Sequence, residues 1–163
     1  MIINFTPADI KLCRRAAEAR VNERIRANKL SLSEYPSAIK CHYSGTLGEY
    51  AVCKAYNCEW SGKYFEGDSW RDRTYDVGVG EVRATTRPEK EGGIRLYPSD
   101  DRLEAPYIWV AIRKFSEHII RAELSGWIYH RDGRKPKWWD EDKGYWLVPR
   151  EELKEMEFLP TQT

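Results

Sequence analysis

The sequence lacks the features that mark membrane and secreted proteins, and it carries almost no net charge. No apolar run approaches the roughly 18 residues that predict a membrane-spanning helix. The N-terminus, Met-Ile-Ile-Asn-Phe-Thr-Pro, has neither the charged start nor the apolar stretch of a signal peptide. Lysine and arginine number 27 and aspartate and glutamate 26, so the formal net charge is +1. We expect a cytoplasmic protein in which any nucleic-acid site arises from local clustering of charge.

Internal repeats, low-complexity tracts and linkers long enough to divide the chain are also missing from the sequence. At 163 residues and 41% hydrophobic content, the chain can bury a real core. We therefore predict a single globular domain over residues 1–163.

The sequence has no Cys-x-x-Cys pair. Its four cysteines are at positions 13, 41, 53 and 58. A zinc site built from Cys41, His42, Cys53 and Cys58 would lack the usual ligand spacing. Cys13 and Cys53 fall on the apolar stripes of predicted helices, where a buried thiol is the ordinary outcome.

Two helices are predicted in the first third of the chain. Thr6 is a good N-cap for a helix with Pro7 in its first turn, and apolar residues then recur at helical spacing as far as Ile25. We expect a connector over residues 31–43 and a second helix from about Ser44 to Asn57. Small residues on neighbouring turns would let this second helix approach a sheet closely: Gly48, Ala51 and Ala55.

The rest of the chain predicts mostly strands. The run Tyr107–Ile112 is the most hydrophobic in the sequence and indicates a strand that is buried on both faces. Gly126–Tyr129 fits either a strand or a short helix. Shorter patterns give the remaining assignments: strands at Trp60–Phe65, Ile94–Tyr97, His118–Leu124 and Tyr145–Val148, a loop at Arg131–Trp139, and a terminal helix at Arg150–Met156.

The stretch from Thr74 to Thr86 predicts a hairpin that turns at Gly78-Val79. Its other residues alternate between two faces, and glycines at 78 and 80 tolerate the positive φ angles of a tight turn. Folding about this midpoint places Asp76 opposite Glu81, with Cβ atoms about 4.5–5.5 Å apart. Two carboxylates so close need a cation, either Arg83 or a bound divalent metal. An exposed hairpin neutralised by Arg83 alone is the alternative interpretation.

Two basic segments are candidates for contacts to nucleic acid. The first helix carries an excess of bases over residues 11–29. The loop Arg131–Trp139 places several bases beside a tryptophan pair, a combination typical of nucleic-acid surfaces. Solvated surfaces are the alternative for both segments. The candidate contact residues are Arg14, Arg15, Arg131, Arg134, Lys135, Lys137 and Trp138.

The order of these motifs resembles the core of the PD-(D/E)XK nuclease superfamily. The match is a helix carrying Glu49, then a hairpin with Asp76 on its first strand and Glu81-Val82-Arg83 on its second. More of the chain is similar to small nuclease-like proteins of phages and bacteria, through Gly-Glu-Tyr-Ala-Val (48–52), Asp-Val-Gly (76–78), Glu-Val-Arg-Ala-Thr-Thr (81–86), Gly-Trp-Ile-Tyr (126–129) and Val-Pro-Arg-Glu-Glu-Leu (148–153). The resemblance implies an α/β (α+β) fold. Its restriction-endonuclease-like mixed sheet, flanked by helices, would form a core over residues 44–153, and residues 1–43 would be an N-terminal helical addition.

The resemblance also implies a metal-dependent endonuclease that hydrolyses DNA phosphodiester bonds. Asp76, Glu81 and Glu49 would bind Mg²⁺ or Mn²⁺ and, with Arg83, form the catalytic set. A phosphodiester is anionic and repels hydroxide, so cations must gather the substrate and activate water. Mg²⁺ is a hard ion that prefers carboxylate oxygens. The implied partner is nucleic acid, DNA in preference to RNA, and the state of assembly is left open with a homodimer among the options.

The chain departs from the superfamily pattern at Arg83, where lysine is usual. A guanidinium stays protonated at any working pH, so it is no general base, but it can orient a phosphate through paired hydrogen bonds. The alternative function is therefore a nuclease-like fold without catalysis that binds nucleic acid or a protein. A structural zinc protein is a third interpretation.

Overall fold

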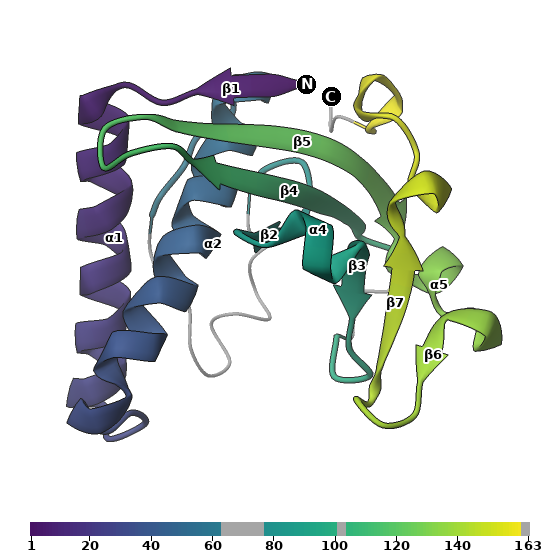
Figure 1. The fold of residues 1–163 in the computed structure, drawn as a ribbon, viewed down its shortest axis with the longest axis horizontal. Coiled ribbons are helices and arrows are strands. Elements are labelled where there is room, and N and C mark those ends of the chain that lie inside the picture. Colours follow the sequence, from purple (N-terminus) through teal and green to yellow (C-terminus); the bar gives the residue numbers. More distant parts are fainter. Residues whose placement is uncertain (63–76, 101–103, 161–163) are drawn as a thin grey trace.

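Two long helices cover one face of a sheet, and a second, smaller sheet lies at the other end of the molecule (Figure 1). The computed structural model describes residues 1–62, 77–100 and 104–160. The class is mixed α and β, as the sequence predicts. Its helices and strands run in the order β1 (Ile2–Asn4), α1 (Pro7–Arg26), α2 (Tyr35–Tyr56), β2 (Glu81–Thr85), α4 (Pro88–Glu91), β3 (Gly93–Leu96), β4 (Pro106–Lys114), β5 (Ile120–Tyr129), α5 (His130–Gly133), β6 (Trp139–Asp140) and β7 (Tyr145–Pro149).

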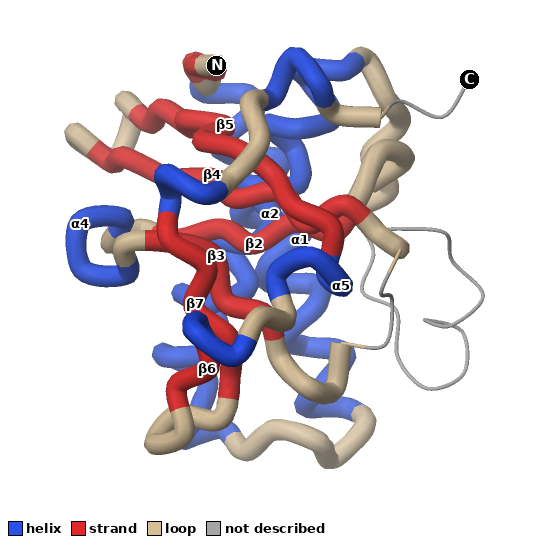
Figure 2. The backbone as a smooth tube through the Cα atoms, turned by 90° about the vertical axis from the view of Figure 1, so that its right-hand side faces the viewer, coloured by secondary structure: helices blue, strands red, loops and turns tan. Residues whose placement is uncertain are grey.

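Both sheets are mostly antiparallel. The larger sheet has the strand order β1-β5-β4-β2, in which β2 runs parallel to β4 and the other neighbours are antiparallel. The smaller sheet has the order β3-β7-β6 and is antiparallel throughout. Figure 2 looks onto the smaller sheet, with α1 and α2 behind the larger one. The larger sheet therefore has helices on one face and the smaller sheet toward the other.

Strand β4 separates two apolar cores. Ile108 and Val110 join the core formed with α1 and α2, whereas Tyr107 and Trp109 join the core beside the smaller sheet. Successive side chains of a strand point to opposite faces, so both faces of β4 are covered. The prediction of a strand buried on both faces is confirmed.

The predicted turn at Gly78-Val79 is present. Val77 and Gly80 form an antiparallel bridge and exchange backbone hydrogen bonds of 3.2 and 3.1 Å, after which β2 begins. The prediction of positive φ angles is wrong, since the described glycines with positive φ are at 62, 92, 126 and 144. Gly80 is instead required by close packing, because a Cβ there would lie 2.5 Å from the Pro106 carbonyl oxygen. The first strand expected at 74–76 lies outside the described residues.

The first helix has the predicted start, whereas the second begins earlier than expected. Thr6 Oγ1 accepts from the Asp9 backbone N–H at 3.2 Å, and Asp9 Oδ2 accepts from Thr6 N–H at 2.8 Å. The expected connector over 31–43 is wrong because α2 starts at Tyr35, with Pro36 in its first turn, where a missing N–H costs nothing. Within the described part of the chain, no helix combines the length and apolar character that crossing a bilayer requires.

Three other local predictions are corrected. The terminal helix at 150–156 is replaced by two short 3₁₀ turns, because Lys154 is extended and exchanges backbone hydrogen bonds of 2.8 and 3.0 Å with Trp127. The segment predicted as a loop at 131–139 holds most of α5 and a 3₁₀ turn, and its last residue begins β6. Of the strand expected at 60–65, the described residues 60–62 are irregular. Gly126–Tyr129 belongs to β5, at a register shift where Gly126 takes a φ of +152°.

Gly48 sets how closely α2 approaches β2. A Cβ at this position would lie 2.6 Å from the Ala84 Cβ. We expect Gly48→Ala to lower the free energy of unfolding by about 1–3 kcal/mol because the helix must move outward. Gly45 is the matched control on the same helix, with nothing within 4 Å of its added Cβ. Gly45→Ala should raise the stability by up to about 1 kcal/mol. Urea unfolding measures both, and equal effects would contradict the close approach.

Candidate functional site

The candidate site begins on the face of β2 that points away from the helices. Val82 and Ala84 pack toward Gly48 of α2, so alternation turns Glu81, Arg83 and Thr85 to the opposite face. Glu81 is buried, with 5% of its surface exposed, and Arg83 is half-buried. The structure therefore brings these two predicted catalytic residues together on one strand, directly after the turn.

Arg83 is held by residues that the sequence did not point to. Its Nη2 donates to Asp100 Oδ1 at 2.8 Å, and its guanidinium carbon lies 5.0 Å from the centre of the Tyr107 ring. Asp100 Oδ2 also accepts from the Tyr97 backbone N–H at 2.9 Å and lies 3.8 Å from His130 Nε2. Asp100 thus fixes the direction in which the Arg83 side chain extends.

His130 is a neutral neighbour of this pair. Its side chain is fully buried, with the Tyr107 ring 5.1 Å away between centres. Burial lowers the pKa of His130 below its ordinary value, although the Asp100 carboxylate opposes that shift. At neutral pH the imidazole is uncharged, and the charge of Asp100 is balanced by Arg83. No sequence pattern marked Asp100 or His130, because both are single residues brought in from distant segments.

Glu49 lies at the interface between α1 and α2, where it is tied to other groups. Its two carboxylate oxygens accept from Arg20 Nη1 at 2.8 Å and Nη2 at 2.6 Å, and the Trp60 indole donates to Oε2 at 3.0 Å. The Arg20 and Glu49 side chains are only 8% and 11% exposed. Arg20 comes from the first helix, so α1 contributes directly to the environment of a predicted catalytic residue.

The described residues do not make a complete metal centre by themselves. Among them, no group of three histidine, cysteine, aspartate or glutamate side chains is arranged to hold an ion. Asp76, the third predicted ligand, lies outside the described residues. Cys13 and Cys53 are buried thiols, as the sequence predicts. Of the three predicted metal ligands, Glu81 and Glu49 are therefore the two that lie in the described part of the chain.

The two basic segments lie at opposite ends of the molecule. Figure 1 places α1 at one end of the long axis and the segment around α5 and β6 at the other. Trp138 is 8% exposed and belongs to the core, with Lys135 and Lys137 ammonium groups each 4.7 Å from its ring centre. It therefore offers little open face to a base.

Most of the arginines in these segments have partners within the chain. The Arg14 guanidinium pairs with Glu117 at 3.1 Å, and that of Arg131 pairs with Glu104. The Arg134 guanidinium lies 4.6 Å from the Trp146 ring centre, and Lys137 pairs with Glu152 at 3.0 Å. Arg15 is exposed on α1 and lines a cavity together with Trp60. These contacts fit solvated surfaces at least as well as a nucleic-acid interface.

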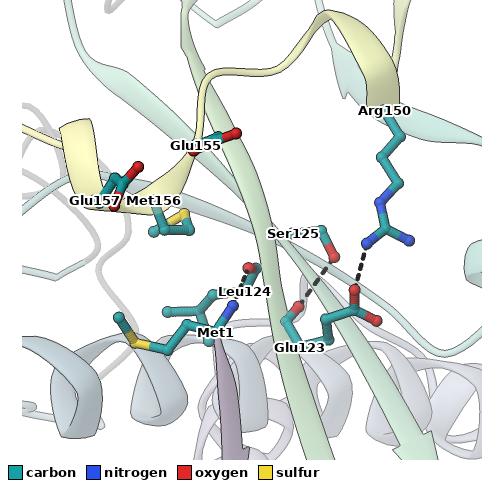
Figure 3. Close-up of a pocket in the computed structure, with 8 residues that line it drawn as sticks. All are labelled: Met1, Glu123, Leu124, Ser125, Arg150, Glu155, Met156 and Glu157. Atoms are coloured by element: carbon teal, nitrogen blue, oxygen red, sulfur yellow. Dashed lines mark hydrogen bonds and ion pairs between the residues drawn. The ribbon is translucent and has the colours of Figure 1, made fainter.

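Two pockets differ in charge. One, of about 460 Å³, opens beside Arg83 and is bordered by basic side chains. The other, of about 410 Å³ and shown in Figure 3, lies between β5 and the C-terminal segment and is lined by Glu123, Glu155 and Glu157. Glu123 pairs with Arg150 there, and hydrogen bonding with Glu155 raises the pKa of Glu157. An excess of carboxylates repels a phosphate, so the pocket beside Arg83 is the better candidate for nucleic acid.

Comparison with protein-family models, with curated proteins and with solved structures gives no match to this chain. The resemblance to the PD-(D/E)XK superfamily therefore stays a prediction, carried by the residues themselves.

Proposed function

We propose that this chain is a nuclease-like protein with a restriction-endonuclease-like core that cleaves DNA phosphodiester bonds with the help of a divalent metal. One observation carries the proposal: Glu81 and Arg83 lie on one face of β2, directly after a two-residue turn, on the strand against which the Glu49 helix packs. This order of helix, turn and acidic strand is the one from which the sequence resemblance was drawn.

Three residues of the chain would have separate roles in this reaction. Arg83 stays protonated and would hold a phosphate through paired hydrogen bonds, from a position that Asp100 fixes. Glu81 would supply a buried carboxylate and Asp76 a second one.

A nicking assay tests the proposal directly. Purified protein should relax or linearise supercoiled plasmid in Mg²⁺ or Mn²⁺, and a chelator should stop the reaction. Plasmid that stays intact with either metal, over a range of protein concentrations, would contradict cleavage.

Arg83 should matter more for turnover than for folding. Loss of one contact to developing charge typically lowers a rate about a hundredfold to a thousandfold, so we expect Arg83→Ala to slow cleavage by that factor. Arg83→Lys should keep part of the activity, since lysine also binds phosphate. Arg113→Ala is the control, because Arg113 lies on β4 in an ion pair with Glu123.

A different result would assign Arg83 a structural role. If Arg83→Ala lowered the melting temperature strongly and Mg²⁺ partly restored it, Arg83 would be a counter-charge for the carboxylates rather than a phosphate contact. Single-turnover cleavage and thermal unfolding, measured on the same samples, separate the two roles.

A second candidate is a nuclease-like protein that binds nucleic acid or a protein without cleaving. The observation that favours it is that Glu49 and Arg83 are both engaged within the chain, by Arg20 and by Asp100. In that case wild type and Arg83→Lys would both fail to cut with Mg²⁺ or Mn²⁺.

A further inference from the structure

The pocket beside Arg83 gathers side chains from four elements. Its cavity of about 460 Å³ lies where the beginning of α2 meets β2, β3 and β4. None of the described residues that line it is acidic. Its basic side chains are Lys40, Arg83, Arg87 and Arg95, and its hydroxyl groups come from Ser44, Thr85 and Thr86.

Local contacts hold two of the segments that carry these bases. The Thr85 hydroxyl accepts from the Arg87 backbone N–H at 3.0 Å, which fixes the chain where it leaves β2. The Arg95 guanidinium lies 5.3 Å from the centre of the Tyr145 ring. Lys40 and Arg87 are exposed, whereas Arg83 and Arg95 are half-buried.

The charge of this pocket contrasts with that of the whole chain. The formal net charge is +1, yet four basic side chains border one cavity, and the described residues that line it include no acid. Arg83 in addition forms an ion pair with Asp100. A recess lined by one sign of charge, with low-dielectric walls, raises the local concentration of counter-ions. The natural ligand of such a recess is an anion, and arginine in particular matches the geometry of a phosphate.

An aromatic side chain at the rim adds a second contact. Tyr97 lines the pocket, is 38% exposed, and packs edge-on against Tyr145 with ring centres 5.5 Å apart. Cations beside a rigid aromatic ring are the combination that holds a nucleotide, with the phosphate on the cations and the base on the ring. The cavity volume also falls within the range of small-ligand sites.

We propose that this pocket is a nucleotide subsite, which binds one phosphate-bearing nucleotide of a nucleic-acid strand beside the position of cleavage. This subsite rests on the proposed function and extends it. Because Arg83 belongs to both the cleavage site and the pocket, the bound nucleotide would lie next to the phosphate that is attacked. Lys40, Arg87 and Arg95 hold its phosphate, and Tyr97 contacts its base or sugar.

The test measures binding without metal, so that it does not depend on cleavage. Fluorescence anisotropy of a labelled single strand and of the matching duplex is recorded in a chelator over a series of salt concentrations. Each lost phosphate contact should reduce the slope of log K against log salt by about 0.7 for the single strand or about 0.9 for the duplex. Arg95→Gln and Lys40→Gln should each show this reduction.

Arg150→Gln is the matched control, since it removes the same charge at the acidic pocket of Figure 3. Its slope should equal that of the wild type. If Arg95→Gln and Arg150→Gln behave alike, or if the wild type binds neither strand, the subsite is overturned, whatever the cleavage assay shows. In the reverse result, Arg95→Gln and Lys40→Gln would reduce the salt slope as expected, but the wild type would not cleave in Mg²⁺. That result would keep the subsite and reject the nuclease.

A competition experiment distinguishes a nucleotide from a bare anion. A deoxynucleoside monophosphate should displace the labelled strand about 5- to 150-fold better than inorganic phosphate, the range that one stacked base supplies. Tyr97→Ala should abolish that difference. Equal competition by the two probes in the wild type would overturn the nucleotide assignment.

Discussion

Magnesium-dependent cleavage by Glu81→Gln should fall by at least about a thousandfold relative to the wild type. Metal-ion catalysis supplies several kcal/mol of transition-state stabilisation, and each 1.36 kcal/mol is a tenfold change in rate. Glu81 is buried on β2, and glutamine has the same size. The substitution therefore removes a negative charge while it keeps the packing. The sequence predicts the same loss for Asp76→Ala.

The controls for this prediction separate chemistry from folding. Glu123→Gln changes a carboxylate on β5 of the same sheet and should leave cleavage unaltered. Metal binding is followed by calorimetry, and strand binding is followed in a chelator. Full cleavage by Glu81→Gln, or unchanged metal binding in both acidic variants, would remove Glu81 and Asp76 from the proposed site.

The second large effect concerns stability, and it arises at Arg20. We expect Arg20→Leu to lower the free energy of unfolding by about 3–5 kcal/mol, because the Glu49 carboxylate would be left buried without its counter-charge. The pair is bidentate, with distances of 2.8 and 2.6 Å, and Arg20 Nε also donates to the Gly62 carbonyl at 3.1 Å. Urea unfolding at neutral pH measures the loss.

Arg14 on the same helix provides the matched control. Its ion pair with Glu117 joins side chains that are 51% and 63% exposed, so Arg14→Leu should cost no more than about 1 kcal/mol. The double variant Arg20→Leu/Glu49→Leu should recover most of the loss, since a well-packed apolar pair can replace a buried ion pair. A cost below 1 kcal/mol for Arg20→Leu would show that Glu49 reaches water or another cation.

Local patterns were enough to predict three features of the fold. The alternation of Glu81 to Thr85, the turn at Gly78-Val79 and the apolar run from Tyr107 are all properties of short segments, and the structure contains each of them. The early start of α2 is not evident from the sequence, because Pro36 fits a connector as well as a first helical turn. The helix predicted at 150–156 does not form because Lys154 pairs with Trp127, a partner that helical periodicity cannot reveal.

The candidate site was predictable only where its residues share one strand. Glu81 and Arg83 are two positions apart, so strand geometry alone places them on the same face. Asp100 reaches Arg83 through tertiary packing. Tertiary packing also brings Arg95 and Lys40 to the same pocket. No pattern in the segment around either residue predicts that it lines a binding site. The motif predicts Glu49 as a metal ligand, whereas its contact with Arg20 depends on how two helices pack.

The pairing of β1 with β5 has a consequence for the order in which the protein forms during synthesis. The Met1 amino group donates to the Leu124 carbonyl, a partner 123 residues further along the chain. At about 5–20 residues per second, a ribosome needs roughly 6–25 s to make that partner. The hairpin of α1 and α2 lies within the first 56 residues and can assemble first. The N-terminal strand must wait until β5 has been synthesised. During that interval its backbone is open to wrong pairing with other strands.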